Sequence, residues 1–273
     1  MITTYNSFAK LNLNLHVYPI DPNNLHPISS IFQEITLYDE LKITTQKNDL
    51  PQLTLSCEGF QMPLNSSNIL HKIFTKLNSY LSHDYNIHIN KRIPLGSGMG
   101  GSSSNAATFL KAINTIENLN WSTNKLIDLS QEFGSDIGFF IVGKTQHVSG
   151  FGNIIKPIAS PIKDTHYTII YPNIHCSTKD IYAHFDKMLE QKNRSNKISE
   201  FEKNYLYEVV LDLYPQMKDF YIQLTNLCNH TIYLTGSGST FFTTHNTYEE
   251  AENLSNKIKN KFSNFYVKSV SNV

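Results

Sequence analysis

Residues 94–107 read PLGSGMGGSSSNAA, and four glycines and four serines stand there between two apolar segments. The segment before them alternates apolar and polar residues, which predicts a strand with one face formed by Ile87, Ile89, Lys91 and Ile93. The segment after them repeats apolar residues at helical spacing, at Ala106, Phe109, Leu110 and Ile113. The quoted stretch is therefore predicted to join a strand directly to a helix.

Glycine and serine suit this junction to holding a phosphate. Glycine lets the backbone adopt positive φ and approach a ligand closely, and the serines at 102–104 can cap free N–H groups before a helix. These N–H groups and the partial positive charge of the helix start attract anions. The alternative is a mobile Gly/Ser connection without a ligand, which composition alone does not exclude.

Three common phosphate motifs do not fit the stretch. Gly96, Gly98 and Gly101 have the spacing of the dinucleotide fingerprint, but the residues after the helix predict a second helix where that motif needs a strand. No Gly-Lys-Ser or Gly-Lys-Thr follows the glycines directly, which excludes a Walker loop. The chain also lacks the His-Arg-Asp and Asp-Phe-Gly motifs of protein kinases.

The composition indicates a soluble, cytoplasmic protein. Its 23 basic and 23 acidic residues argue against a nucleic-acid partner. The N-terminus lacks the pattern of a signal peptide, and no apolar run is long enough to cross a membrane. The three cysteines are scattered and no zinc-ligand spacing occurs, so we expect neither disulfides nor a protein-held metal.

The rest of the chain mixes strands and helices without a repeat, so an α+β fold is expected. Further strands are predicted at 11–17, 31–38, 41–45, 137–142 and 265–269. Further helices are predicted at 67–80, at 123–133 and after the capping box Thr247-x-x-Glu250. Residues 187–203 are predicted to be a polar surface insertion, and a boundary near 157–161 would divide the chain into domains 1–157 and 158–273.

Three segments resemble the motifs of the GHMP kinases, a superfamily that includes galactokinase, homoserine kinase and mevalonate kinase. FAKLNLNLHV at 8–17 is similar to the first motif, the glycine-serine loop to the second, and LTGSGSTFF at 234–242 to the third. The motifs keep the family order and span nearly the whole chain. The resemblance implies a two-domain fold with the ATP and substrate cleft between an N-terminal ATP-binding domain and a C-terminal domain.

Within the superfamily, the chain is most similar to the 4-diphosphocytidyl-2-C-methyl-D-erythritol kinases of the non-mevalonate isoprenoid pathway. The shared patterns are AKLNL, SSNAA, FGSD at 133–136 and CSTKDIY at 176–182. The resemblance implies transfer of the γ-phosphoryl group of ATP, with Mg²⁺ carried by ATP, to the 2-hydroxyl of a cytidine diphospho-methylerythritol. It also implies a small-molecule enzyme that is a monomer or weak homodimer.

Two alternatives stay open beside this function. One is another GHMP kinase of the homoserine or mevalonate type, which the FAKLNL segment disfavours. The other is a catalytically silent nucleotide-binding relative, which the presence of both Lys10 and Asp136 disfavours.

The resemblance implies that Lys10 and Asp136 form the catalytic pair. Phosphoryl transfer to an alcohol needs a group that accepts the hydroxyl proton, and a nearby ammonium keeps that carboxylate ionised. By pattern alone, Asp136 could instead be a turn or cap residue and Lys10 a solvated lysine on an open sheet face. The resemblance decides for the catalytic roles.

The remaining site residues are also carried over from the resemblance. The ATP phosphates are expected at Pro94, Leu95, Gly96, Ser97, Gly98, Met99, Gly100, Gly101, Ser102, Ser103 and Ser104. Ser104 is in addition a candidate ligand of the magnesium. Substrate contacts are expected from Asn12, His26, Lys91, Phe185, Gly236 and Ser237. Two of these sites have local alternatives: Lys91 could be a strand-end lysine at the surface, and residues 236–239 could be only a hairpin turn.

The chain departs from the family pattern at two places. The family carries Asp-Gly-Tyr-His where this chain has Asn23-Asn24-Leu25-His26, so the tyrosine that packs on the cytosine ring is missing. His26 is expected at the edge of the cytosine, and Phe185 is expected to stack on it. The third glycine before the family's serines is replaced by Ser102, which is small and can cap a helix.

Overall fold

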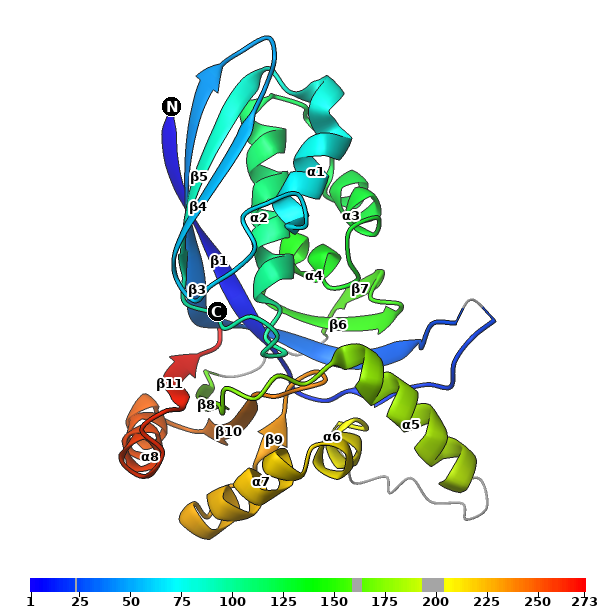
Figure 1. The fold of residues 1–273 in the computed structure, drawn as a ribbon, viewed down its shortest axis with the longest axis vertical. Coiled ribbons are helices and arrows are strands. Elements are labelled where there is room, and N and C mark those ends of the chain that lie inside the picture. The colour runs from blue at the N-terminus through cyan, green and yellow to red at the C-terminus, as the bar shows by residue number, and fades with distance from the viewer. Residues whose placement is uncertain (23, 159–163, 193–203) are drawn as a thin grey trace. The chain divides into compact units, whose positions relative to one another are not determined.

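The computed structural model describes residues 1–22, 24–158, 164–192 and 204–273 (Figure 1). The chain forms two compact units, and the expected α+β class is confirmed. Unit 1 consists of Met1–Lys10, Leu37–Leu95 and Gly100–Gly143, and unit 2 of Leu11–Thr36, Gly96–Met99 and Lys144–Val273. The predicted domains 1–157 and 158–273 stay a prediction. The compact units are divided differently: unit 1 lies wholly within 1–157, whereas unit 2 takes residues from both predicted domains.

The strands of unit 1 form a mixed sheet around β5 (His83–Lys91). On one side β5 pairs antiparallel with the second half of β3 (Ile28–Lys47), and on the other it pairs in parallel with β4 (Leu53–Gly59). The strand β1 (Ile2–Asn12) pairs with β3. Tyr85, Ile87 and Ile89 are buried while Asn86 and His88 are exposed, so one face of the sheet is covered, as the period of two predicts.

Helices cover that face of the unit 1 sheet (Figure 1). They are α1 (Ile69–Leu77) with the short η1 (Asn78–Tyr80), α2 (Gly101–Ile116), α3 (Thr123–Ser130) and α4 (Ile137–Val142). α2 follows the glycine-serine loop and buries both its small and its large apolar residues, among them Ala106, Phe109 and Ile113. The predicted helices at 67–80 and 123–133 and the predicted strand-loop-helix junction are therefore confirmed.

The predicted strand at 137–142 is wrong, because these residues form the helix α4. The segment IGFFIV is apolar at every position, so its sequence carries no period that separates helix from strand, although Val142 at its end is exposed. Gly143 ends the helix at φ 79°, and its N–H donates to the carbonyl of Phe139 at 2.7 Å. The positive φ at a glycine is a common helix ending.

Unit 2 contains an antiparallel sheet with the strand order β11-β8-β10-β9. Its strands are β8 (His166–Tyr171), β9 (Tyr233–Leu234), β10 (Phe241–His245) and β11 (Tyr266–Ser271), and its helices are α5 (Thr178–Lys192), α6 (Tyr207–Leu213), α7 (Pro215–Leu227) and α8 (Tyr248–Lys261). The capping box at Thr247 and Glu250 opens α8 as predicted, and the predicted strand at 265–269 is confirmed as β11. A core of buried apolar side chains, including Phe220 and Phe241, holds this unit together.

The first half of β3 also belongs to unit 2, where it pairs with β2 (His16–Val17) and with β6 (Thr145–Gly150), which pairs in turn with β7 (Ile154–Pro157). The two strands predicted at 31–38 and 41–45 are thus one continuous strand. The predicted strand at 11–17 is interrupted, because the Asn14 side chain accepts from the Ile31 N–H at 2.6 Å and takes the place of a backbone partner. Of the predicted insertion, residues 187–192 lie in α5 and 193–203 lie outside the described residues.

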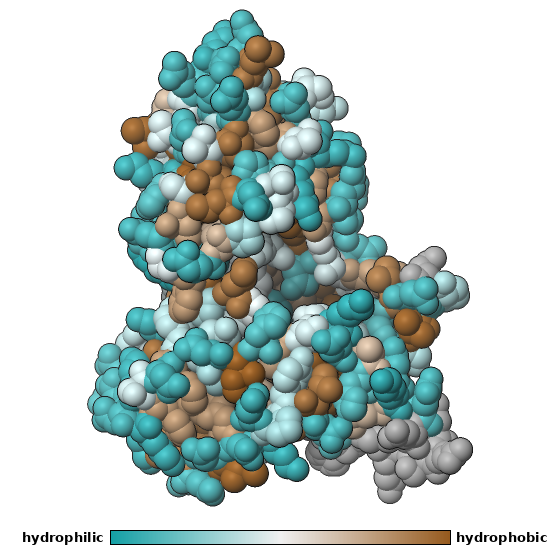
Figure 2. Space-filling view, viewed as in Figure 1, coloured by the Kyte–Doolittle hydropathy of each residue, from teal (hydrophilic) through white to brown (hydrophobic). Residues whose placement is uncertain are grey.

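The surface drawn in Figure 2 shows hydrophobic side chains in small groups among hydrophilic ones. Among the residues that the structure describes, no helix has both the length and the apolar character that a membrane crossing requires.

Candidate active site

Lys10 and Asp136 form an ion pair inside unit 1. Lys10 lies near the end of β1, Asp136 immediately precedes α4, and the Lys10 Nζ is 3.6 Å from the Asp136 Oδ2. The lysine side chain is 4% exposed and the aspartate side chain 29%, so solvent reaches the carboxylate while the ammonium is enclosed. Lys10 is therefore not the solvated lysine of the alternative reading. Asp136 does stand in a turn and at the N-cap position of α4, as the alternative reading has it, but its side chain makes no capping hydrogen bond to the helix.

Burial makes the charged form of Lys10 costly and lowers its pKa from the ordinary value of a lysine. The Asp136 carboxylate opposes this effect through its charge and a hydrogen bond. The arrangement provides a carboxylate that is accessible on one side and held beside a cation on the other. Such a carboxylate is placed to accept a proton from a bound hydroxyl.

The glycine-serine loop leads into α2, whose first N–H groups point out of the start of the helix. Gly100 is the N-cap residue at φ 72°, and the first intrahelical bond runs from the Ser104 N–H to the Gly100 carbonyl at 2.9 Å. The N–H groups of the residues before Ser104 therefore have no acceptor within the helix. The serines were expected to precede and cap the helix, and this is wrong: all three lie in its first turn and no side chain caps it.

Two glycines of the loop are required by the packing of the protein itself. At Gly98, with φ 78°, a Cβ would lie 2.5 Å from the Thr235 carbonyl oxygen and 2.8 Å from that of Gly238, all within unit 2. At Gly100, a Cβ would lie 2.8 Å from the ring of Phe140 in unit 1. The loop backbone thus runs directly against its neighbours, which leaves it less freedom than a mobile linker would have.

Unit 2 brings residues of the first, second and third motifs together. The Asn12 N–H donates to Thr235 Oγ1 at 2.9 Å, and the Asn12 side-chain amide donates to Ser30 Oγ at 3.0 Å. The Thr240 N–H donates to the Ser97 carbonyl at 3.3 Å. The turn at 236–239 does connect paired strands, β9 and β10, and Ser237 Oγ is 2.8 Å from Thr178 Oγ1.

His26 lies in unit 2 among the residues of α5. Its Nδ1 donates to the Tyr18 carbonyl at 2.8 Å, and its Nε2 is 3.4 Å from Asp186 Oδ2. The ring centroid is 5.0 Å from that of Tyr182 and 5.9 Å from that of Phe185. Phe185 is 4% exposed and belongs to the core of the unit, so its ring is packed among protein side chains.

Lys91 is fully buried at the end of β5, so it is not a strand-end lysine at the surface. Its ammonium is paired with the carboxylate of Asp39, which the sequence reasoning missed. A signal for Asp39 exists, because it alternates with the apolar Leu37, Leu41 and Ile43 on one face of its strand. A single charge on an apolar face usually has a buried partner, and Lys91 occupies the same kind of position on the neighbouring strand.

Within the described part of the chain, no three His, Cys, Asp or Glu side chains converge as a metal site would require. The Ser104 hydroxyl, the candidate magnesium ligand, is buried and accepts a hydrogen bond from Ser7 Oγ at 2.8 Å.

Comparison with known proteins places these motifs in a family. The sequence model of the GHMP kinases N terminal domain matches residues 68–144. A 4-diphosphocytidyl-2-C-methyl-D-erythritol kinase of Buchnera aphidicola is 33% identical, and the match covers 99% of this chain and 94% of that protein. The kinase of the same name from Alkaliphilus oremlandii is 31% identical, with 90% and 89% covered. The chain belongs to the GHMP kinase family.

Solved structures of GHMP kinases have the same fold. A crystal structure of 4-(cytidine 5'-diphospho)-2C-methyl-D-erythritol kinase aligns with a TM-score of 0.75 at 22% identity, over 98% of this chain and 99% of that one. A homoserine kinase from Cytophaga hutchinsonii aligns with a TM-score of 0.62 at 14% identity, over 97% and 94%. As a GHMP kinase, the protein is an ATP-dependent small-molecule kinase.

The contacts of Gly98 lead to a prediction about stability. Gly98→Ala should lower the free energy of unfolding by at least about 1–3 kcal/mol, because a Cβ strains the positive φ and meets two carbonyl oxygens. Urea denaturation measures this loss. Gly134→Ala is the matched control, since a Cβ there meets only the Ile137 side chain, at the ordinary distances of 3.4 Å and 3.6 Å. Equal stability of the two variants would show that the loop backbone does not press against 235–238.

The burial of Lys10 predicts a pH-dependent stability. Because its pKa is lowered in the folded state, the unfolded chain binds more protons between that pKa and about 10.4, and stability due to this group rises with pH in that window. The unfolding free energy of the wild type relative to Lys10→Met should therefore increase as the pH is raised from neutral into the alkaline range. Lys42→Met, at an exposed position of β3, reports the effect of losing a surface lysine. If the unfolding free energy of the wild type relative to Lys10→Met fell with rising pH, the lowered pKa of Lys10 would be contradicted.

Proposed function

We propose that the protein transfers the γ-phosphoryl group of ATP to the 2-hydroxyl of 4-diphosphocytidyl-2-C-methyl-D-erythritol, a step of the non-mevalonate isoprenoid pathway. The observation that carries the proposal is the enclosed Lys10 beside the accessible Asp136, 3.6 Å apart, in a chain whose relatives over nearly its full length are named as kinases of this compound. A silent relative would have no need to keep a lysine enclosed beside a carboxylate, because the burial of its charge is costly.

In the proposed reaction, Asp136 accepts the proton of the attacking hydroxyl as its oxygen bonds to the γ-phosphorus. The bond from the γ-phosphorus to the β,γ-bridging oxygen breaks, and ADP leaves with that electron pair. Lys10, held beside Asp136, stabilises the negative charge that develops near the accepting oxygen. The solvent-accessible side of Asp136 is where the hydroxyl would reach it.

The proposed ATP site is the loop of residues 94–104, with backbone N–H groups between residues 95 and 103 as donors, including those at the start of α2. Pro94 has no N–H, and the Ser104 N–H is taken by the Gly100 carbonyl. These donors and the helix dipole together favour the charge of a triphosphate. Magnesium would arrive with ATP and neutralise part of that charge, with the Ser104 hydroxyl as its candidate protein ligand.

The proposed substrate contacts lie in unit 2, with the exception of Lys91. His26 is proposed at the edge of the cytosine; its Nδ1 donates to the Tyr18 carbonyl, and its Nε2 lies 3.4 Å from Asp186 Oδ2. Asn12, Gly236 and Ser237 would contact the methylerythritol part. Phe185 and Lys91 stay predictions, and the burial of both side chains means that either would have to gain exposure to reach a ligand.

The finer assignments complete the proposal. The enzyme would act in the cytoplasm on a free small molecule, as a monomer or weak homodimer. The balanced charge, 23 basic against 23 acidic residues, supports a partner other than nucleic acid.

Turnover with a panel of alcohols tests the function. We expect ADP release with ATP and the cytidine diphosphate substrate, and none with homoserine or mevalonate. Asp136→Asn should lower kcat by roughly 10²–10⁴-fold, because the shape is kept and the proton acceptor is lost, with ATP affinity little changed. Phosphorylation of homoserine or mevalonate instead would refute the substrate, and near-normal turnover of Asp136→Asn would remove this residue from the mechanism.

Leu25 provides a separate test of the cytidine site. Its side chain is 53% exposed and lacks the aromatic face that the family tyrosine offers. Leu25→Tyr should lower KM for the cytidine substrate by up to about tenfold at unchanged kcat, since a stacked pair is worth about 0.5–1.5 kcal/mol and acts equally on ground and transition states. Steady-state kinetics measures this split, with Leu25→Met as the control of similar size. An unchanged or higher KM would mean that residue 25 does not face the base.

A further inference from the structure

The Asp39 carboxylate is fully buried on β3 and accepts hydrogen bonds from four donors. Its Oδ1 accepts from the N–H groups of Arg92 and Ile93, both at 2.8 Å. Its Oδ2 accepts from the ammonium of Lys91 and from the side-chain amide of Asn105 at 3.0 Å. All these residues belong to unit 1, and they surround the carboxylate with one full charge and three neutral donors.

These donors come from the two ends of the phosphate loop. At residues 91–93 the chain leaves β5 and enters the phosphate loop. Asn105 lies in the first turns of α2, just after the chain has left the loop. One side chain therefore fixes the separation of the two loop ends. The start of α2 packs closely against the end of β5. A Cβ at Gly101, the first residue of α2, would lie 2.8 Å from Lys91 Nζ.

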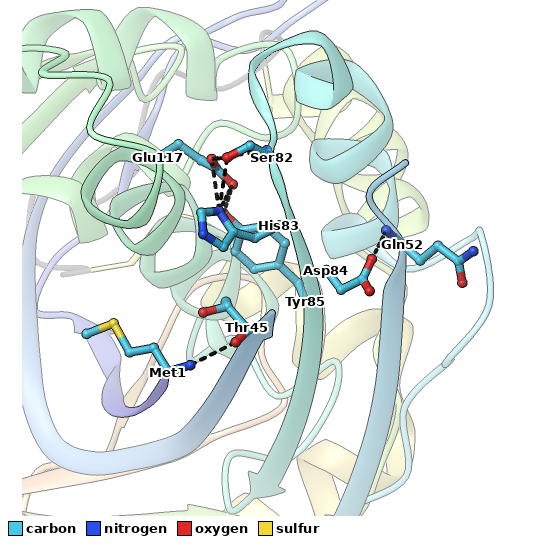
Figure 3. Close-up of polar contacts among 8 residues, drawn as sticks. All are labelled: Met1, Thr45, Gln52, Ser82, His83, Asp84, Tyr85 and Glu117. Atoms are coloured by element: carbon cyan, nitrogen blue, oxygen red, sulfur yellow. Dashed lines mark hydrogen bonds and ion pairs between the residues drawn. The ribbon is translucent and has the colours of Figure 1, made fainter. Parts of the chain in front are cut away.

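The far ends of the same strand and helix are held by a second carboxylate, Glu117, at the C-terminal end of α2 (Figure 3). Glu117 accepts from Ser82 Oγ at 2.7 Å, from the Ser82 N–H at 3.1 Å and from the Tyr85 hydroxyl at 2.8 Å, and His83 Nδ1 is 3.2 Å away. These hydrogen bonds lower the pKa of Glu117 despite its burial. β5 and α2 are thus joined by buried carboxylates at both ends, but only Asp39 lies at the loop.

We propose that Asp39 is a positioning residue for ATP, which holds the phosphate loop and the start of α2 in their binding geometry before the nucleotide arrives. The proposal rests on the proposed function, in which residues 94–104 bind the triphosphate. A loop whose ends are already fixed loses less conformational entropy on binding, and this gain appears as affinity. Asp39 itself need not touch the ligand, since it acts through the backbone of residues 92 and 93 and through Asn105.

The substitution Asp39→Asn tests the hydrogen bonds of Asp39 without changing the size of its side chain. Asparagine keeps the shape but has one acceptor oxygen, and its amide group is a donor. Whichever way the amide turns, it faces either the N–H groups of Arg92 and Ile93 or the donors of Lys91 and Asn105. One end of the loop is released in both cases.

The experiment measures the dissociation constant of Mg-ATP by calorimetry in the absence of any alcohol, together with the thermal midpoint of each variant. We expect Asp39→Asn to weaken ATP binding by about tenfold. Glu117→Gln is the matched control, because it also removes a buried carboxylate between β5 and α2. It should lower the thermal midpoint and leave ATP affinity unchanged.

Asn105→Ala keeps the proposal testable if Asp39→Asn does not fold. It removes the tether from Asp39 to α2, together with the Asn105 hydrogen bond to Ser7 Oγ, and leaves the Asp39–Lys91 pair in place. It should weaken ATP binding by a few-fold. ATP affinity equal to that of the wild type in folded Asp39→Asn or Asn105→Ala would overturn the proposal, as would an equal loss in Glu117→Gln. If the wild type binds ATP but does not phosphorylate the cytidine substrate, the proposed function is refuted. The effect of Asp39 on ATP affinity would not be affected by that outcome.

Discussion

Enclosing the ammonium of Lys10 costs free energy, and the negative charge of Asp136 offsets part of that cost. Much of unit 1 serves to hold this pair. The last turn of α3 is followed by a short connection to Asp136, and α4 then descends into the apolar interior, where Ile137 and Phe139 are fully buried. Because α4 cannot shift without exposing these side chains, the position of Asp136 opposite Lys10 is set by the core.

Unit 1 contains a second ion pair, between Asp39 and Lys91, which differs from the first in the accessibility of its carboxylate. Here both side chains are inaccessible, and every oxygen of the carboxylate has protein donors. A buried carboxylate whose oxygens all accept protein hydrogen bonds orders the backbone around it. It has no acceptor position left for a reacting group. The accessible Asp136 is suited to chemistry, and the enclosed Asp39 is suited to holding a loop.

Much of the fold was predictable because the signals are local. The alternation in β5, the helical spacing in α2 and the capping box of α8 each depend on neighbouring residues in the sequence. The failures have physical causes that lie outside such windows. The segment of α4 is apolar on all sides and carries no period, and the role of the serines in α2 depended on Gly100 adopting the cap conformation before them.

The site was predictable as a set of motifs, but the partners within it were not. The pairing of Lys10 with Asp136 joins residues far apart in the sequence, and only the family resemblance suggested it. The buried state of Lys91 depends on Asp39, which no motif includes. A charged residue at an apolar position of a strand, seen twice in neighbouring strands, is the pattern that would have indicated this pair.

A double-mutant cycle on kcat tests most directly whether Lys10 and Asp136 work as one unit. It compares the wild type with Lys10→Met, with Asp136→Asn and with the double variant, all at saturating ATP and cytidine substrate. If the ammonium acts through the carboxylate, the double variant should be about as slow as the slower single variant, because residues that act together have non-additive effects. A double variant whose loss of kcat equals the product of the two single losses would show that the residues contribute independently and would contradict the account.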